Sequence, residues 1–226
     1  MIATGSLGEQ QYEVYVLDTS HVPELMTLQQ EVVEALPDKA ILQPLDEEEL
    51  LFILQGNGLM IGIFVGDKLI AFRALLEPEL DAEHLGYDIG LTTEADLRQV
   101  LYQEISNVHP DFRGYGLQRL MAEIVMAQVD SSKHPIICAT VMPYNIASLK
   151  DKFLQGMHVA ALKYKYGGKL RYVFVKYLNE AVVCGEETVD ISMGDTEGQQ
   201  QLLKAGFVGI EMKSAGDDFI VTYRKK

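Results

Sequence analysis

The stretch Ser106–Leu120, SNVHPDFRGYGLQRL, decides how this chain folds. A β-rich segment ends at Pro110, a turn holds Gly114 and Gly116, and an amphipathic helix begins directly afterwards. Glycine lets the backbone approach a ligand closely, and the first N–H groups of a helix have no partner within it. Because the helix dipole favours negative charge there, the stretch predicts a phosphate cradle, with Arg113 as a cation at its edge.

Two other glycine-rich phosphate motifs fit less well. A dinucleotide-binding G-x-G-x-x-G turn would need a third glycine where the chain has Arg119, which is too bulky for close packing of helix on strand. The P-loop pattern G-x-x-x-x-G-K-[ST] is absent from the sequence. A plain turn between strand and helix would not require arginine before two glycines at this spacing, so we favour an anion-binding turn.

Strands and helices alternate on both sides of this stretch. The apolar pattern predicts helices over residues 21–36, 46–55 and 145–155, one beginning near residue 117, and a short one over 94–100. It predicts strands over residues 11–17, 59–65, 68–76, 101–109, 135–142, 158–166 and 170–176, with a loop over 77–93. This alternation predicts an α/β or mixed α+β domain.

The last part of the chain repeats an earlier pattern at a spacing of 50 residues. Asn145 corresponds to Asp195, both good helix N-caps, and Gly156 corresponds to Gly206, a helix stop. We expect strands over residues 188–193, 207–213 and 219–224 and a helix over 196–205. The predicted organisation is a domain over residues 1–178 and a C-terminal β-α-β-β extension over 179–226, packed on that domain.

Composition narrows the partners. The 226 residues include 33 acidic and 19 basic ones, for a net charge of −14, and such a surface repels nucleic acid. The longest strongly apolar run, residues 59–65, is far too short to span a membrane, and the N-terminus does not resemble a signal peptide. The chain has only two cysteines, Cys138 and Cys184, which is too few for a disulfide scaffold, so we expect a cytoplasmic protein. The five histidines are scattered along the chain, and we therefore expect no metal site.

The segment HPDFRGYGLQRL, residues 109–120, resembles the acyl-CoA signature [Q/R]-x-x-G-x-[G/A] of the GNAT superfamily of N-acetyltransferases. Arg113 and Gly116 match the signature, whereas Gln118 stands where glycine or alanine is usual. The resemblance implies a mixed, mostly antiparallel central sheet flanked by helices.

A second landmark of the same family follows along the chain. The segment TVMPYN, residues 140–145, a helix containing Ser148, and then Gly156-Met157 resemble the family's strand–Asn–helix–Gly-Phe segment. The resemblance covers residues 12–178 and implies acetyl-CoA as cosubstrate and an amine as acceptor. The cofactor-binding residues that it implies are Val108, Arg113, Gly114, Tyr115, Gly116, Leu117, Gln118, Asn145 and Ser148.

The sequence offers candidates for the catalytic residues. Lys152 shares a helix face with Asn145 and Ser148, and it stands where many family members have a tyrosine that protonates the leaving thiolate. Tyr144 is the nearest other hydroxyl. Glu104, which strand alternation places on one face with Ser106 and Val108, is the candidate base for the amine, and His109 is a second one.

The sequence therefore predicts an acetyl-CoA-dependent N-acetyltransferase that acts on a primary amine of a small molecule or peptide by direct attack. A non-catalytic acyl-CoA-binding or sensor protein of the same fold is the alternative, because the tyrosine is missing. A structural or partner-binding module on this fold is a third. We expect variable segments, among them the helical N-terminal region and residues 78–100, to form the acceptor pocket, and the partners allowed by the sequence include a second copy in a homodimer.

Overall fold

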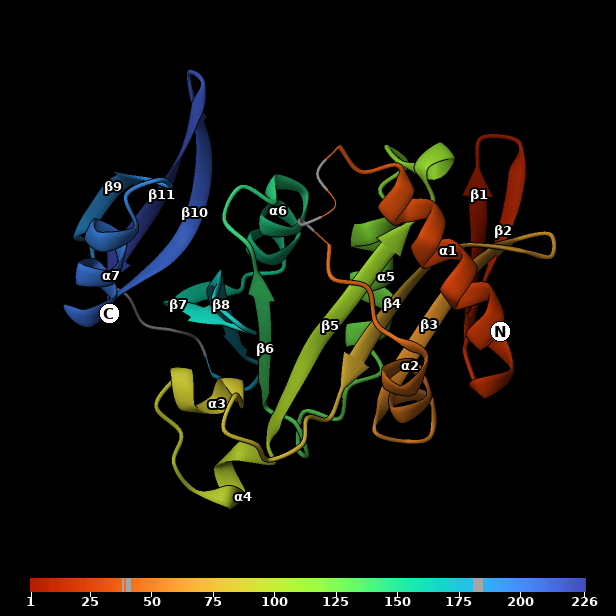
Figure 1. The fold of residues 1–226 in the computed structure, drawn as a ribbon, viewed down its shortest axis with the longest axis horizontal. Coiled ribbons are helices and arrows are strands. Elements are labelled where there is room, and N and C mark those ends of the chain that lie inside the picture. Colours follow the sequence, from red (N-terminus) through yellow and green to blue (C-terminus); the bar gives the residue numbers. More distant parts are fainter. Residues whose placement is uncertain (38, 40–41, 181–184) are drawn as a thin grey trace. The chain divides into compact units, whose positions relative to one another are not determined.

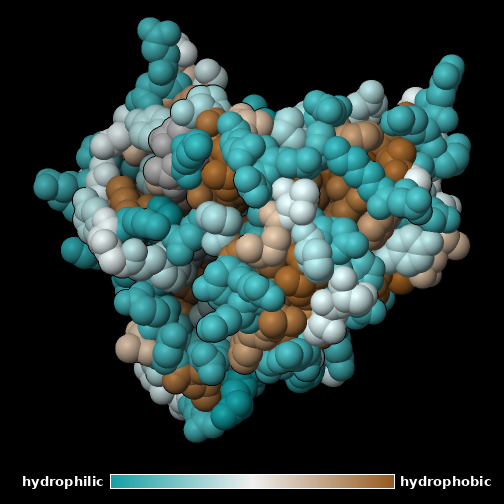
Figure 2. Space-filling view, turned by 45° about the vertical axis from the view of Figure 1, so that its right-hand side comes forward, coloured by the Kyte–Doolittle hydropathy of each residue, from teal (hydrophilic) through white to brown (hydrophobic). Residues whose placement is uncertain are grey.

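The computed structural model describes residues 1–37, 39, 42–180 and 185–226. The chain divides into two units, Met1–Glu77 with Tyr102–Val129 and Pro78–Leu101 with Asp130–Lys226 (Figure 1). It is a mixed α/β protein whose sheet is mostly antiparallel and flanked by helices, as the sequence predicts. Figure 2 shows hydrophilic residues over most of the face it presents, with apolar residues visible between them.

The first unit is a meander of antiparallel strands with helices on both faces. Its strands follow one another as β1 (Ala3–Leu7), β2 (Gln10–Val16), β3 (Gly58–Val65), β4 (Lys68–Leu76) and β5 (Val100–Val108, from Tyr102 in this unit). Its helices are η1 (Thr19–His21), α1 (Val22–Glu34), α2 (Glu47–Leu54), η3 (Pro110–Phe112) and α5 (Leu117–Met126). Strand β1 was not predicted, because its sequence, ATGSL, has no clear apolar alternation.

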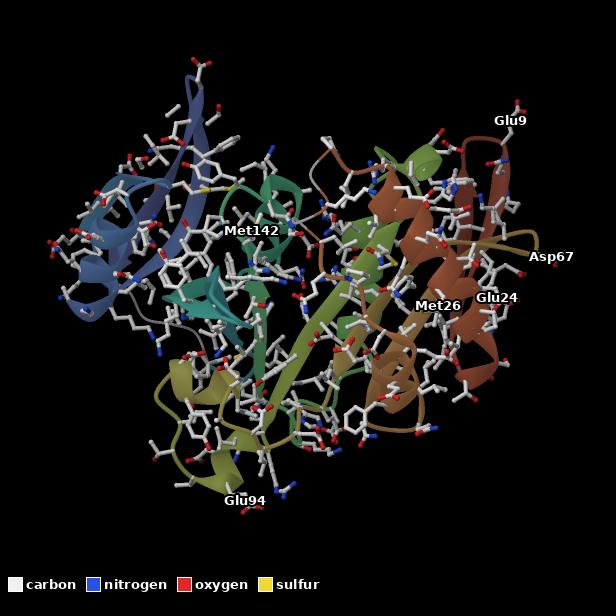
Figure 3. The ribbon with its side chains drawn as sticks, viewed as in Figure 1. Glu9, Glu24, Met26, Asp67, Glu94 and Met142 are labelled. Carbon is white, nitrogen blue, oxygen red and sulfur yellow. The ribbon has the colours of Figure 1, made fainter. Side chains whose placement is uncertain are left out.

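The core of this unit lies between the sheet and helices α1 and α2. The apolar stripe that predicted α1 is buried there, with Leu25 and Leu28 packed against Phe72 of β4 and Ile105 of β5. Helix α5 packs against β3 and β4 on the face of the sheet opposite α1 and α2 (Figure 1). Both faces can be covered because neighbouring residues of a strand point to opposite sides of the sheet. Side chains at the hairpin tips, such as Glu9 and Asp67 in Figure 3, point outwards.

The second unit continues the alternation of helices and strands. Its elements are α3 (Leu85–Asp88), α4 (Glu94–Leu97), β6 (Ile136–Val141), α6 (Ile146–Leu154), β7 (His158–Lys165), β8 (Lys169–Tyr177), β9 (Thr188–Ser192), α7 (Thr196–Lys204), β10 (Phe207–Ala215) and β11 (Asp218–Lys225). The strands are ordered β6-β8-β7-β10-β11-β9. Helix α3 lies inside residues 77–93, which the sequence predicted as a loop.

The 50-residue repeat seen in the sequence is also a repeat of the backbone. The first repeat comprises β6, α6, β7 and β8 (residues 136–177), and the second, C-terminal repeat comprises β9, α7, β10 and β11 (residues 188–225). Asn145 and Asp195 have nearly the same conformation (φ −75°, ψ 73° and φ −81°, ψ 77°), and each caps its helix by accepting a hydrogen bond from the backbone N–H three residues later. Both helices are followed by a left-handed glycine, Gly156 (φ 73°) and Gly206 (φ 84°). Even the β-bulges correspond, because one follows Val159 in β7 and the other follows Gly209 in β10.

The two repeats contact each other through equivalent elements, as the two subunits of a two-fold symmetric dimer do. Val159 of β7 pairs with Gly209 of β10, so equivalent positions of the two repeats face each other. Helix α6 of the first repeat contacts β10 of the second, and helix α7 of the second contacts β7 of the first. Such reciprocal contacts are the mark of an isologous interface, here formed within one chain.

This arrangement places the expected boundary at residues 178–179 inside the second unit rather than between units. Cys138 is fully buried, and burial raises the pKa of its thiol. Cys184 lies outside the described residues. In the described part of the chain, no helix combines the length and apolar character needed to cross a bilayer.

Candidate active site

The predicted phosphate cradle has the backbone that its glycines suggest. Gly114 (φ 86°) and Gly116 (φ 74°) are both left-handed, and Gly116 is the N-cap of α5 without any side-chain cap. A Cβ atom added at either glycine would meet no protein atom within 4 Å. Because Arg113 is exposed beside this open turn, the N-terminus of α5 presents N–H groups and a guanidinium where an anion can approach.

A buried arginine that the sequence analysis did not single out supports this turn. Arg73 of β4 is only 1% exposed, and its guanidinium donates to the Gln118 carbonyl oxygen (3.2 Å) and to Gln103 Oε1 of β5 (2.6 Å). It therefore ties the first turn of α5 to the strand that leads into it, and it holds a permanent positive charge there. The available signal was a single arginine inside the apolar strand LIAFRALL, residues 69–76.

Glu104 lies at an irregularity in β5. Ala74 pairs with Ile105 and Leu75 pairs with Gln103, so Glu104 is the extra residue of a β-bulge. Burial still alternates beyond the bulge, since Glu104 is exposed and Ser106 and Val108 are half-buried, while the residues between them are buried, in keeping with the predicted shared face. The Glu104 side chain stays accessible to solvent, whereas Val108, the last residue of β5, is half-buried.

The environment of Glu104 changes its acidity. Burial of the carboxyl among protein atoms, helped by the negative charge of Glu49, raises the pKa of Glu104 to about 7. Water still reaches the side chain, so the group is crowded by protein but not sealed from solvent. Glu49 is held in place because its carboxylate accepts a hydrogen bond from the Asp46 N–H (2.8 Å) in the capping box that begins α2.

His109, the second candidate base, is built into the fold. Its Nδ1 atom accepts a hydrogen bond from the Asp111 N–H (3.1 Å) and thereby caps the short helix η3. Its Nε2 atom lies 2.8 Å from Lys68 Nζ and 3.3 Å from Glu31 Oε2. With only 7% of the residue exposed, the imidazole joins α1, β4 and the turn, which favours a structural role.

In the second unit, the predicted cofactor face lies on α6. Asn145 caps the helix by accepting from the Ser148 N–H (3.3 Å), so this side-chain oxygen fixes where the helix begins. Lys152, two turns further on, is 7% exposed, and its Nζ atom lies 3.1 Å from Asp151 Oδ2. Lys152 is therefore a buried, ion-paired lysine rather than an ordinary solvent-exposed one.

Tyr144 directly precedes this helix and is held by the C-terminal repeat. Its backbone is left-handed (φ 66°), and its hydroxyl donates to Asp218 Oδ1 (3.0 Å). Burial, together with this hydrogen bond to a carboxylate, raises the pKa of Tyr144. Nearly half of the residue is still exposed (47%).

The predicted site residues thus fall into two local groups. The strand β5, the glycine turn and the start of α5 carry one group in the first unit, and the turn and helix after β6 carry the other in the second unit. Within the described residues, no cluster of three or more His, Cys, Asp or Glu side chains is arranged to hold a metal ion.

Comparison with known proteins identifies the fold. No protein-family model and no curated protein matches the sequence. Among solved structures, yncA of Salmonella typhimurium, solved with acetyl-CoA, matches with a TM-score of 0.56 and 14% identity over 76% of this chain and 96% of its own. The ribosomal-protein-S18-alanine N-acetyltransferase of Escherichia coli matches with a TM-score of 0.55 and 16% identity over 78% and 97%.

A third solved structure names the family. An acetyltransferase of the GNAT family from Streptococcus pneumoniae matches with a TM-score of 0.54 and 17% identity, over 74% of this chain and 99% of its own. The chain therefore has the fold of the GNAT acetyltransferases, which the glycine turn and the Asn145 segment predicted. At such identities the likeness concerns the fold, and the activity has to be argued from the residues.

Proposed function

We propose that the protein is an acetyl-CoA-dependent N-acetyltransferase in which a primary amine attacks the acetyl group directly. One observation carries the proposal: in a GNAT fold, Glu104, a carboxyl group with a pKa of about 7, lies on the strand that leads into an open glycine turn at the start of α5. Similar proteins, one of them solved with acetyl-CoA, support this interpretation.

The glycine turn suits the phosphate end of acetyl-CoA. The open space over Gly114 and Gly116 and the uncapped start of α5 fit a pyrophosphate held by the N–H groups of residues 114–118. The exposed Arg113 adds a charge-assisted contact at the edge. We also assign Asn145 and Ser148, at the start of α6, to cofactor binding. When bound, acetyl-CoA supplies an activated acetyl thioester.

Glu104 has the acidity that a general base needs. An amine must lose a proton before it can attack, and a base works best when its pKa lies near the working pH. With a pKa of about 7, the Glu104 carboxylate is available at neutral pH and still accepts a proton readily. Backbone groups at Val108, the last residue of β5, would polarise the thioester carbonyl.

The departing thiolate needs a positive charge or a proton. The Tyr144 hydroxyl already donates its hydrogen to Asp218, so we assign this role to Lys152. An ammonium group offers three N–H donors, and Lys152 Nζ lies 3.1 Å from Asp151 Oδ2. A buried lysine would thus stabilise thiolate charge where the family usually has a tyrosine.

The direct test is to incubate the full chain with acetyl-CoA and a panel of small amines and peptides while following the release of free thiol. Thiol release that depends on an amine is expected, and mass spectrometry should find the acetylated amine. Binding of acetyl-CoA without turnover across a broad panel would contradict the enzyme proposal and favour the sensor of the same fold.

The role of Glu104 has its own test. Glu104→Gln should lower kcat by roughly 10²-fold or more while the affinity for acetyl-CoA stays unchanged. In the wild type, kcat/KM should rise with pH up to about 7 and then level off, because the carboxylate forms as pH rises through the pKa of Glu104. The variant should lack that inflection.

Glu9→Gln is the matched control for this variant. It removes the same charge from an exposed hairpin tip (Figure 3) and should leave both the rate and its pH profile unchanged. A Glu104→Gln protein with wild-type turnover would dismiss Glu104 as the base and direct attention to His109.

A further inference from the structure

The C-terminal repeat forms hydrogen bonds with the turn that directly precedes helix α6. Asp218, the first residue of β11, accepts hydrogen bonds from two hydroxyl groups, that of Tyr144 (3.0 Å) and that of Ser192 (2.6 Å). The bond to Ser192 stays within the second repeat. The bond to Tyr144 crosses to the first repeat and reaches a residue directly before the α6 N-cap, just beyond Met142, which is labelled in Figure 3.

A second contact acts on the same residue. The Tyr144 N–H points to the Met193 sulfur at 3.2 Å, and Met193 is itself 1% exposed. Tyr144 has φ 66°, a left-handed conformation that a bulky residue adopts only when its surroundings impose it. Side-chain and backbone contacts from the repeat therefore hold Tyr144 in an otherwise unfavourable conformation.

The repeat symmetry explains why there is room for this contact. The residue 50 positions after Tyr144 is Gly194, and a Cβ atom added there would lie 3.0 Å from the Tyr144 hydroxyl oxygen. The Gly194 N–H donates to Ser192 Oγ (3.1 Å), which in turn donates to Asp218. A tyrosine in one repeat thus rests on the glycine that takes its place in the other.

We propose that Asp218 is a positioning residue of the cofactor site: it fixes Tyr144 and thereby the turn from which Asn145 and Ser148 approach acetyl-CoA. The inference rests on the proposed function. It gives the C-terminal repeat a task beyond covering β7. It also removes Tyr144 from the chemistry, since the hydroxyl hydrogen is committed to Asp218.

The test compares variants of the full chain. Asp218→Ala and Tyr144→Phe should each raise the KM for acetyl-CoA about tenfold, the size expected for losing one hydrogen bond to a charged group, with kcat within twofold of wild type. The double variant should be no worse than Asp218→Ala alone, because Asp218→Ala already removes the contact that Tyr144→Phe removes. Asp217→Ala is the matched control, since it removes a neighbouring exposed carboxylate and should change nothing.

A readout independent of catalysis is the titration of Tyr144, read as the difference in tyrosinate absorbance between wild type and Tyr144→Phe. The Asp218 carboxylate contributes to the raised pKa of Tyr144, so Asp218→Ala should lower that pKa, whereas Asp218→Glu should keep it raised. Restoration of the wild-type KM by Asp218→Glu would support positioning by a carboxylate. An Asp218→Ala protein whose KM and Tyr144 titration match those of Asp217→Ala would overturn the inference.

Two outcomes separate this inference from the proposed function. If wild type binds no acetyl-CoA, the proposed function fails and takes the positioning role with it. If wild type is active but Tyr144→Phe loses kcat while Asp218→Ala does not, the proposed function stands and the positioning role is wrong, because Tyr144 would then act on the reacting groups itself.

Discussion

The two repeats of the second unit share a backbone and differ in the face of their helices. Both helices begin at an acceptor side chain that caps the N–H three residues on, and both end before a left-handed glycine. The first helix carries Asn145, Ser148 and Lys152 at the positions where the second carries Asp195, Gly198 and Leu202. The hydroxyl and the ammonium group are thus absent from the second copy.

This difference separates what the scaffold needs from what the chemistry needs. The cap, the bulge and the terminal glycine recur because any β-α-β-β unit of this kind requires them. The polar face of α6 is absent from the second repeat, so the scaffold does not require it, and we propose that it binds acetyl-CoA. Function on a given fold resides in such side chains rather than in the backbone.

The largest expected effect comes from removing the second repeat. Deleting residues 180–226 would uncover β7 and take away the buried Phe207, Val208 and Tyr223. The buried Tyr172 hydroxyl would also lose its acceptor, Gln199 Oε1 (2.7 Å). Since each buried apolar side chain contributes about 1.5–3 kcal/mol, the truncated chain should aggregate or melt far below the full chain in a thermal unfolding scan.

A truncated chain that stays soluble, monomeric and equally heat-stable would contradict the claim that the second repeat stabilises the first. It would show that the pairing of Val159 with Gly209 contributes nothing to the first repeat. The equivalence of the two repeats would then have no energetic meaning.

A smaller effect is expected where the two helices differ most. Lys152→Met leaves the buried Asp151 carboxylate without this ammonium group, which should cost about 3 kcal/mol or more in the free energy of unfolding. Leu202→Ala, at the equivalent position of the second helix, shortens a half-buried side chain and should cost roughly 1–2 kcal/mol. Urea unfolding of both variants measures the difference, and equal losses would contradict an ion pair at position 152.

The smallest effect concerns what the helices share. Asn145→Ala and Asp195→Ala each remove an N-cap, and each should cost about 1 kcal/mol of stability. Only Asn145→Ala should also weaken the binding of acetyl-CoA, which calorimetry would detect. A weakening of similar size in Asp195→Ala would mean that helix stability, rather than the polar face of α6, governs affinity.

Periodicity in the sequence predicted most of the elements, and their boundaries lie within a few residues of those observed. The stripe Leu117, Met121 and Val125 is buried as its helical spacing indicates. The repeat was visible because caps and helix stops are local signals that depend on few residues.

Features that depend on contacts between distant segments were not predicted. The bulge at Glu104 has no local signature in the sequence, because it depends on the pairing of β5 with β4. The burial of Lys152 and the hydrogen bond from Tyr144 to Asp218 depend on segments that come together only in the folded chain. Arg73 was visible as a lone charge in an apolar strand, but its partner Gln118 lies on another element.

The most direct test of the central claim is calorimetric titration of the full chain with acetyl-CoA, using two glycine variants. Gly116 (φ 74°) begins α5 and Gly216 (φ 62°) lies in the hairpin between β10 and β11; both are left-handed, and a Cβ at either meets no atom within 4 Å. Gly116→Val should weaken binding on the order of 10²-fold, because its side chain would enter the pyrophosphate path, while Gly216→Val should bind like wild type. Unchanged affinity in Gly116→Val would contradict the assignment of this turn to acetyl-CoA.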